Sequence, residues 1–153
     1  ALHVPLVITG GPFTGGKAIQ DLVSTESLPK TILAMAGVDV GDQMIGENLL
    51  DVAEGRTEGR ENQVFAQISE SRIGRVARTA DFLYAVYAPG VNGGEKGASD
   101  VYADDYLYDL KKDPWQLENV VASPEYSEAK ADMRKRLLDW IEKAEGYRPV
   151  ITD

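Results

Sequence analysis

The sequence contains no cysteine, a single histidine and fewer positive than negative charges. The missing cysteines exclude disulfide bonds, thiolate zinc sites and cysteine nucleophiles. Because His3 is the only histidine, a two-histidine metal site is excluded, as is a serine–histidine pair elsewhere in the chain. The 16 Lys and Arg residues face 25 Asp and Glu residues, for a formal net charge of -9. We therefore expect no nucleic-acid partner, since binding to a phosphate backbone depends on positive charge.

Long hydrophobic runs are also missing: no apolar stretch approaches the roughly 18 residues of a membrane span, so none is predicted. The 153 residues, 43% of them hydrophobic, suffice for one well-buried core. The chain begins with Ala1 and enters an apolar run within three residues. We interpret it as a processed or excised piece of a longer protein.

The first third of the chain predicts one strand and one helix. The run "VPLVIT" (4–9) is continuously apolar, which is typical of a strand buried on both faces. "SLPKTILAMAGV" predicts a helix with Ser27 as N-cap, Pro29 in its first turn and Gly37 just past its end. Apolar residues lie almost all round this helix, so we expect it to be buried.

From residue 64 onward the hydrophobic period changes to two, which predicts strands. "VFAQISES", "RIGRVARTA", "DFLYAVYA" and "DDYLYDL" are separated mostly by short connections and favour antiparallel hairpins. The exception is the glycine-rich loop 89–100. A final helix over about 124–145 is predicted, with Ser123 as N-cap and Gly146 at its end. Its expected buried face consists of Met133, Leu137, Leu138, Ile141 and Ala144.

The glycine-rich stretch "GGPFTGGKA" raises the question of a phosphate-binding loop. Gly11, Gly16 and Lys17 fit the Walker A spacing, but Ala18 stands where the magnesium-binding hydroxyl belongs. The residues that follow are a poor helix opening, whereas the motif needs a helix N-terminus. We therefore predict a surface loop.

Two further groups of residues have a structural and a functional interpretation. The aspartates of the fourth predicted strand and its flanks lack EF-hand spacing and favour a solvated face over a calcium site. The tyrosines are interpreted first as sheet residues and second as a ligand-stacking surface. No complete catalytic set emerges. The aspartates are Asp100, Asp104, Asp105, Asp109 and Asp113, and the tyrosines are Tyr84, Tyr87, Tyr102, Tyr106 and Tyr108.

Four stretches in order resemble the C-terminal part of arylsulfatase-like sulfatases of the alkaline phosphatase superfamily. "HVPLVITG" is similar to the family's (His or Arg)-Val-Pro-Leu strand, and "SLPKTILAMAGV" to its Asp-Leu-x-Pro-Thr-Leu-Leu-x-x-Ala-Gly-Val helix. "GENLLDVAEGR" resembles Gly-x-Ser-Leu-Leu-x-x-Leu-x-Gly. The most specific match is "LYDLKKDPWQLENV", which resembles Leu-Tyr-Asp-Leu-x-x-Asp-Pro-x-Gln-x-x-Asn-Leu.

The resemblance implies an α/β (α+β) fold. Residues 1–60 would be the end of the catalytic domain and its large mixed sheet. Residues 61–153 would be a C-terminal subdomain, with a roughly four-stranded antiparallel sheet packed against the long helix.

The resemblance also implies that the parent protein hydrolyses sulfate esters. Its formylglycine nucleophile, made within a Cys/Ser-x-Pro-Ser-Arg motif, and its calcium ligands would lie outside this segment. We therefore expect no catalytic, cofactor-binding or metal-binding residue here, and an inactive segment whose partner is the missing N-terminal catalytic part. His3 would lie closest to the parent's active site, as a structural residue or one that supports the catalytic groups without being one of them. The loop 89–100 would either shape the substrate cleft or be disordered.

Two other hypotheses stay open at this point. The parent could be a phosphoesterase of the same superfamily, because this region does not contact the reacting group. Alternatively, the chain is a free-standing binding module that uses its tyrosine-rich sheet.

Overall fold

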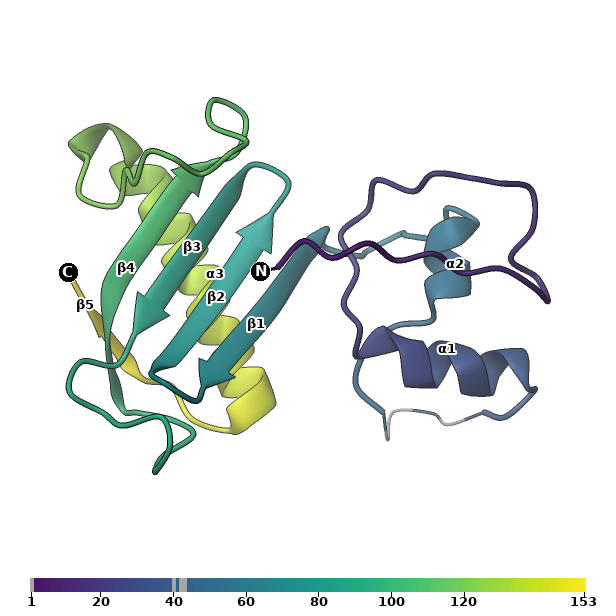
Figure 1. Ribbon diagram of the computed structural model, residues 1–153, viewed down its shortest axis with the longest axis horizontal. Helices are drawn as coiled ribbons and strands as arrows, with labels where there is room; N and C mark the ends of the chain where they lie inside the picture. The colour runs from purple at the N-terminus through teal and green to yellow at the C-terminus, as the bar shows by residue number, and fades with distance from the viewer. Residues whose placement is uncertain (1, 40, 42–43) are drawn as a thin grey trace. The chain divides into compact units, whose positions relative to one another are not determined.

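The computed structural model describes residues 2–39, 41 and 44–153. In chain order the elements are α1 (Ser27–Met35), α2 (Leu49–Ala53), β1 (Gln63–Ser69), β2 (Ile73–Thr79), β3 (Phe82–Tyr87), β4 (Val101–Asp109), the 3-10 helix η2 (Pro124–Tyr126), α3 (Ser127–Glu145) and β5 (Val150–Thr152) (Figure 1). The chain divides into two compact units, a first unit of Ala1–Asn62 and a second unit of Gln63–Asp153.

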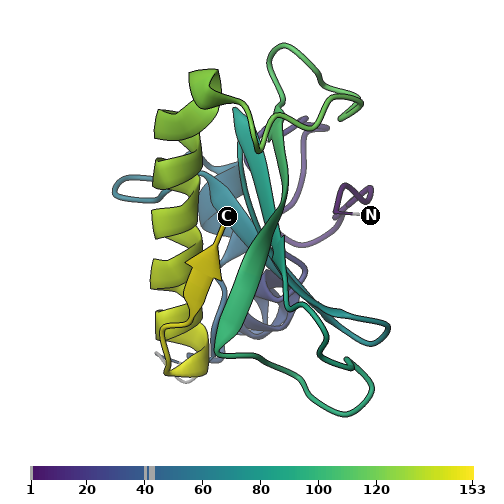
Figure 2. The ribbon, with the colours of Figure 1, turned by 90° about the vertical axis from the view of Figure 1, so that its left-hand side faces the viewer.

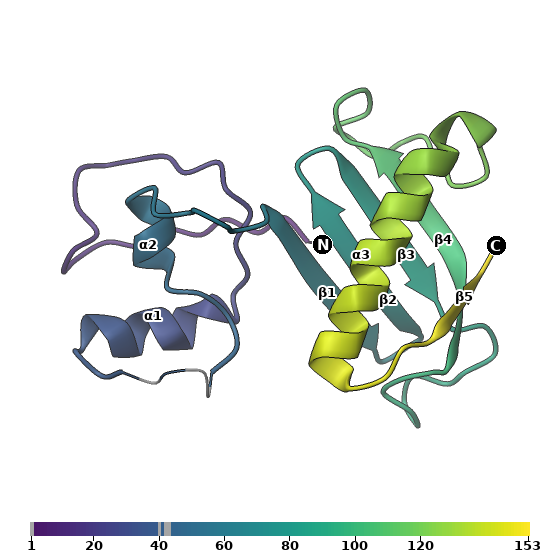
Figure 3. The same ribbon diagram turned by 180° about the vertical axis from the view of Figure 1, so that it is seen from behind.

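The second unit is a five-stranded sheet in the order β1-β2-β3-β4-β5. The pairs from β1 to β4 are antiparallel, and β5 pairs in parallel with β4. Helix α3 covers one face of the sheet (Figures 2 and 3). The predicted α/β class, with antiparallel hairpins and a long C-terminal helix, is confirmed, and β5 makes the sheet mixed.

The core of the second unit lies between α3 and the sheet. Met133, Leu137 and Ile141 of α3 are buried against the strands, as their helical spacing predicts. Leu138 is only half-buried, and the predicted core position of Ala144 is wrong because that residue is exposed. Burial of each large aliphatic side chain contributes about 1.5–3 kcal/mol of transfer free energy. These side chains therefore hold α3 on the sheet.

The ends of the long helix match the sequence prediction with one difference. Pro124 begins a 3-10 turn, η2, that leads directly into α3. Ser123 has the extended backbone of an N-cap, but its side chain makes no capping hydrogen bond. Gly146 ends the helix at φ 76°, and its N–H donates to the carbonyl of Glu142. Because L side chains rarely adopt this left-handed conformation, the glycine is required there.

Polar contacts hold the first unit together. Arg60 binds the Glu47 carboxylate with N–O distances of 2.6 and 2.8 Å and contacts Asp21 at 3.3 Å. At the start of α1, Gly46 lies so close to the backbone of Glu26 and Ser27 that a Cβ would stand 2.9 Å from it. This approach needs a glycine.

The predicted N-cap role of Ser27 is wrong. The helix begins at Ser27 itself, so Glu26 holds the N-cap position, and its side chain makes no capping hydrogen bond. The Ser27 hydroxyl instead accepts a hydrogen bond from the N–H of Glu47 at 3.1 Å. One turn later the Thr31 hydroxyl donates to the Ser27 carbonyl at 2.7 Å and accepts from the N–H of Leu49 at 2.9 Å. These hydroxyls fasten the loop before α2 to α1.

Two expectations for the apolar residues of the first unit are wrong. Residues 4–9 form no strand, and Val7 is 88% exposed. Helix α1 is not buried all round, because Ile32 is 63% exposed and Met35 40%. A strand needs a neighbour to hydrogen-bond to, and an apolar helix face needs a surface to pack on. The described part of the first unit supplies neither.

Among the described residues, no helix is both long enough and apolar enough to cross a membrane.

Candidate functional site

The glycine-rich segment of the first unit is not a phosphate-binding loop. Gly10 and Phe13 pair across a tight turn, and residues 17–20 that follow are not helical. The Lys17 ammonium donates to the carbonyl of Ala53 at 3.4 Å. The helix N-terminus that would bind a phosphate is therefore missing after this loop, and the predicted surface loop is confirmed.

His3 lies exposed on the extended N-terminal segment. Among the described residues there is no group of three or more His, Asp or Glu side chains that could hold a metal ion. We find no nucleophile with a neighbouring base among the contacts of His3 or of the buried hydroxyls of Ser27 and Thr31, whose partners are backbone groups.

The aspartates of β4 are neither a calcium site nor, for the most part, a solvated face. The Asp109 carboxylate accepts hydrogen bonds from the N–H groups of Lys111 and Lys112 and from the Tyr126 hydroxyl. Burial alone would raise the Asp109 pKa, but these donors lower it below its ordinary value. Asp113 accepts from two backbone N–H groups of the next turn. These carboxylates organise turns, and only Asp100 is exposed as predicted.

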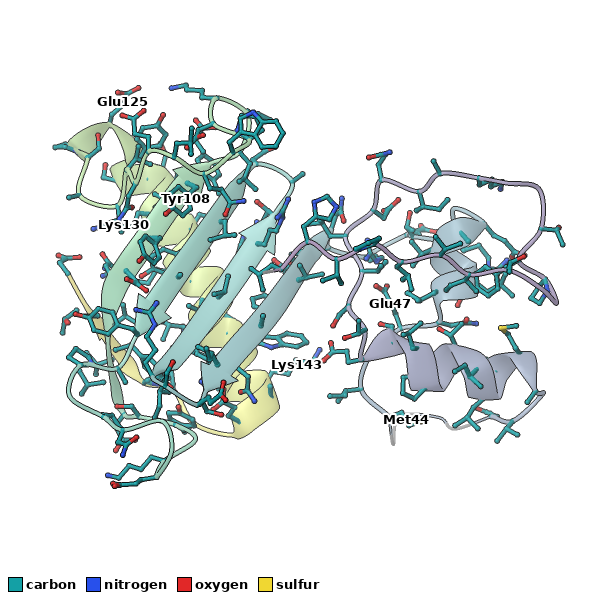
Figure 4. The ribbon with its side chains drawn as sticks, viewed as in Figure 1. Met44, Glu47, Tyr108, Glu125, Lys130 and Lys143 are labelled. Atoms are coloured by element: carbon teal, nitrogen blue, oxygen red, sulfur yellow. The ribbon has the colours of Figure 1, made fainter. Side chains whose placement is uncertain are left out.

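A further aspartate, Asp104, is at the centre of an ion network between the sheet and α3. Its side chain is 7% exposed and binds Lys130 at 3.0 Å and Arg134 at 2.9 Å. Both cations also contact Asp153, so the network ties the C-terminal residue to the helix. The Tyr84 hydroxyl donates to Asp104, and burial together with this hydrogen bond raises the Tyr84 pKa. Figure 4 labels Lys130, one of the two cations.

The five tyrosines are divided between the two faces of the sheet. Tyr84 and Tyr102 are fully buried on the face covered by α3. Tyr106 and Tyr108 pair with Ala85 and Leu83 on the opposite face and stack on each other with centroids 5.7 Å apart. Figure 4 shows Tyr108 on the side of the sheet away from α3. The sheet-residue interpretation therefore fits the first pair better than the second.

The sheet face opposite α3 is strongly apolar. No helix of the second unit covers it (Figures 2 and 3). Its arginine, Arg78, has a buried Nε without a hydrogen-bond partner among the described residues. A solvated face of an antiparallel sheet is normally polar. Strand alternation assigns to this face Val64, Ala66, Ile68, Val76, Arg78, Leu83, Ala85, Tyr87, Tyr106 and Tyr108.

The loop 89–100, between β3 and β4, is ordered by a buried arginine. The Arg75 side chain is only 4% exposed and binds Glu145 of α3 with N–O distances of 2.7 and 2.8 Å. The same guanidinium donates to the carbonyl of Gly97 at 2.9 Å. At the other side of the loop, a Cβ on Gly93 would stand 2.7 Å from the carbonyl of Glu70. The guanidinium thus anchors the loop at Gly97, and at Gly93 the loop lies too close to the neighbouring turn to admit a side chain.

Two tyrosine hydroxyls fix the end of this loop. The N–H of Ser99 donates to the Tyr102 hydroxyl and the Tyr147 hydroxyl donates to the Ser99 carbonyl, each at 3.2 Å. Burial is the main reason why the Tyr147 pKa is raised, so its hydroxyl stays protonated and can donate. Beside these residues lies an open pocket of about 470 Å³, lined by Val91, Lys96, Ala98, Ser99, Asp100, Val101 and Tyr147.

Sequence reasoning missed this pocket and its anchor. One signal was present: Arg75 alternates with Ile73 and Ala77, so it occupies a core-facing position of β2 where a charge needs a partner. No local pattern identifies Glu145 as that partner, because 70 residues separate the two.

No protein-family model matches the chain. It is 27% identical, over an alignment 161 positions long, to a Delta 4,5-hexuronate-2-O-sulfatase of Bacteroides thetaiotaomicron; the alignment covers 99% of this chain and 31% of the relative. It is 26% identical to an arylsulfatase of Clostridium perfringens, over 86% of this chain and 25% of that protein.

Solved structures show the same similarity. A crystal structure from Bacteroides thetaiotaomicron, assigned as a sulfatase, matches 78% of this chain and 24% of its own, with 25% identity and a TM-score of 0.61. A second structure, in complex with its substrate D-glucosamine-2-N,6-O-disulfate, matches 80% of this chain and 24% of its own. Its identity of 20% and TM-score of 0.66 show a shared fold.

The resemblance to sulfatases that the motifs predict is therefore confirmed in sequence and in fold. The chain spans between 25% and 31% of the length of these two curated relatives.

Proposed function

We propose that this chain is the C-terminal part of a sulfatase, a hydrolase of sulfate esters. Residues 1–60 would complete the catalytic domain, and residues 61–153 would form its smaller C-terminal subdomain. The order of the four motifs and the partial coverage of full-length sulfatases both support this assignment.

The observation that carries the proposal is the reversed polarity of α1. The helix buries Ser27 and Thr31 and exposes Ile32 and Met35. A surface helix of a complete domain does the opposite, because apolar area in contact with water costs about 25 cal/mol per Å². Only two large apolar residues of the described first unit, Leu49 and Val52, are buried. Its exposed ones are Leu2, Val4, Leu6, Val7, Ile19, Ile32, Met35, Val38 and Ile45.

These surfaces are what the missing part of a sulfatase would cover. Residues 4–9 would add a strand to the large sheet, where their continuous apolar pattern is expected. The outward side of α1 would pack on that sheet. In the second unit, the exposed part of the apolar face opposite α3, at Ile68 and Tyr106, would be covered as well.

The catalytic groups would come from the missing part. The chain contains neither a cysteine nor the Cys/Ser-x-Pro-Ser-Arg motif from which formylglycine is made. The described residues do not fit calcium, because most carboxylates of β4 and its flanks already bind cations or N–H groups. We expect the segment alone to be inactive. His3, at the start of the apolar segment, would lie near the parent's active site as a supporting residue.

Sulfated sugars are the substrate class that we propose for the parent. One relative is named for a 2-O-sulfated hexuronate, and one solved structure holds a sulfated glucosamine. A phosphoesterase of the same superfamily is the competing assignment.

Two activity assays test the proposal. The longer protein should release sulfate from D-glucosamine-2-N,6-O-disulfate or 4-nitrophenyl sulfate, and the 153-residue chain should release none. Faster hydrolysis of 4-nitrophenyl phosphate than of the sulfate by the longer protein would favour the phosphoesterase. Sulfate release by the chain alone would contradict the proposal that the catalytic groups come from the missing part.

Dye binding tests the uncovered surfaces and separates a fragment from a free-standing module. The chain alone should bind an apolar fluorescent dye, and Ile32→Ser should reduce the signal. Leu117→Ser, at an exposed leucine of the second unit, is the matched control and should change it less. A chain that binds no dye would favour the free-standing binding module.

A further inference from the structure

The loop 89–100 and its pocket lie outside the apolar surfaces that the missing part would cover. A twelve-residue connection with four glycines is normally mobile, and long ordered loops in compact domains are usually functional. Here the loop is held at Gly97, whose carbonyl accepts from the Arg75 guanidinium that Glu145 positions, and Gly93 lies against the turn between β1 and β2. Desolvating an ion pair is costly, so its use under a surface loop points to selection for one loop conformation.

The last residues of the loop are held just as firmly. Its Ser99 backbone binds the hydroxyls of Tyr102 and Tyr147 through its N–H and its carbonyl. The next residue, Asp100, accepts the N–H of Val150 on its carbonyl at 2.9 Å, which joins the loop to β5. The floor of the pocket is therefore preorganised, and a ligand would lose little conformational entropy of the protein on binding.

The pocket combines two unused charges with an apolar wall. Among the described residues, neither the Lys96 ammonium nor the Asp100 carboxylate makes an ion pair, and both residues are exposed. Val91 and Val101 supply aliphatic surface, and the ring of Tyr147 is fixed through its hydroxyl. The volume of about 470 Å³ lies within the range of small-molecule sites.

We propose that this pocket binds a saccharide that carries an anionic group. The Lys96 ammonium binds the anion, and the Asp100 carboxylate accepts hydrogen bonds from sugar hydroxyls. The Tyr147 ring and the two valines pack on the apolar face of the sugar ring. A simple anion uses only the Lys96 ammonium, whereas a sugar that carries an anionic group also offers hydroxyls to Asp100 and an apolar face to Tyr147. The choice of sugar rests on the proposed function, but the binding does not require that any sulfate ester be cleaved.

The test is an NMR titration of the full chain with four probes. These are D-glucosamine-2-N,6-O-disulfate, D-glucuronate, D-glucose and inorganic sulfate. Saturable shifts of the amides of loop 89–100 and Tyr147 are expected with the first two, at millimolar concentration. The sulfated and the carboxylated sugar distinguish the two sources of the anionic group. Because the assay measures binding, it can succeed even if the parent has no sulfatase activity.

Two variants and a control test whether Lys96 and Asp100 bind the saccharide. Lys96→Gln should weaken binding of the anionic sugars about five- to tenfold, the loss of one charge-assisted contact. Asp100→Asn should weaken the sugars but not inorganic sulfate. Lys111→Gln, beyond the opposite end of β4, removes an exposed lysine that pairs with Asp81 outside the pocket and should leave affinity unchanged.

Several results would overturn the proposal. These are the absence of saturable shifts with either anionic sugar, equal binding of inorganic sulfate and the disulfated sugar, or an unchanged affinity in Lys96→Gln. Retained amide spectra in the variants would show that any loss does not come from unfolding.

Discussion

Replacing Arg75 by methionine should destabilise the second unit and release the loop 89–100. The arginine is charged in the folded protein. Burial alone would lower its pKa, but the hydrogen bonds to Glu145 more than offset this and keep the pKa above its ordinary value. Methionine preserves much of the buried aliphatic volume. The substitution therefore removes mainly the charge and its hydrogen bonds to Glu145 and to the carbonyls of Gly74 and Gly97.

The magnitude follows from the burial of the two partners. Removing one member of a fully buried ion pair costs about 3–5 kcal/mol, because the other charge is left uncompensated. The Glu145 side chain is 22% exposed and can regain some water. We therefore expect a loss of about 2–3 kcal/mol in the free energy of unfolding. Adding Glu145→Gln should restore part of it, since no unpaired charge then remains.

Urea unfolding followed by tryptophan fluorescence measures this loss in the second unit alone, because both tryptophans, Trp115 and Trp140, lie there. Arg148→Gln is the matched control. Its ion pairs with Asp139 and Glu142 are exposed, so about 0.2–1 kcal/mol is expected. A loss no larger than that of the control, with unchanged amide exchange at Ser99, would refute the anchoring role of Arg75.

Three further outcomes are expected. Leu137→Ala should cost about 2–5 kcal/mol through the cavity that it leaves under α3, whereas Leu117→Ala at an exposed site should be nearly neutral in the same urea experiment. Thr31→Val should speed amide exchange at Leu49, whose N–H loses its acceptor, while Thr31→Ser should not; equal exchange in both variants would contradict this. Because the folded-state pKa of Asp109 is lowered, its contribution to stability is complete above the unfolded-state pKa of about 3.9 and is lost as pH falls through the folded value. The stability gap between the native chain and Asp109→Asn should therefore shrink from pH 7 to acid pH, and a constant gap would show that the ionised carboxylate contributes nothing.

The second unit could be predicted well from the sequence because its patterns are local. The spacing of Met133, Leu137 and Ile141 reports directly which face of α3 packs on the core. In β1 the alternation predicts the strand but not the core-facing side, because Phe65 packs on the core while Val64, Ala66 and Ile68 lie on the opposite face. Strand β5 escaped prediction because its three residues are too few to show a period. The partners of Asp104 and Arg75 could not be predicted either, since they come together only after the helix has packed on the sheet.

In the first unit, the sequence pattern predicts more buried surface than the described residues provide. The apolar run at residues 4–9 and the apolar sides of α1 are typical of buried elements, yet both are exposed. The sequence predicts Ser27 as a cap because it precedes the periodic residues. Its hydroxyl instead binds the loop at Glu47, a contact 20 residues away that no local rule contains. The disagreement at α1 is itself what the proposed missing part would explain.

The most direct test of the central claim is to read the coding sequence immediately upstream of residue 1. We expect an in-frame segment that carries a Cys/Ser-x-Pro-Ser-Arg motif together with metal-binding carboxylates, which would assign every catalytic role to the part outside this chain. A start codon directly before residue 1 would contradict the account and would favour a complete short binding protein.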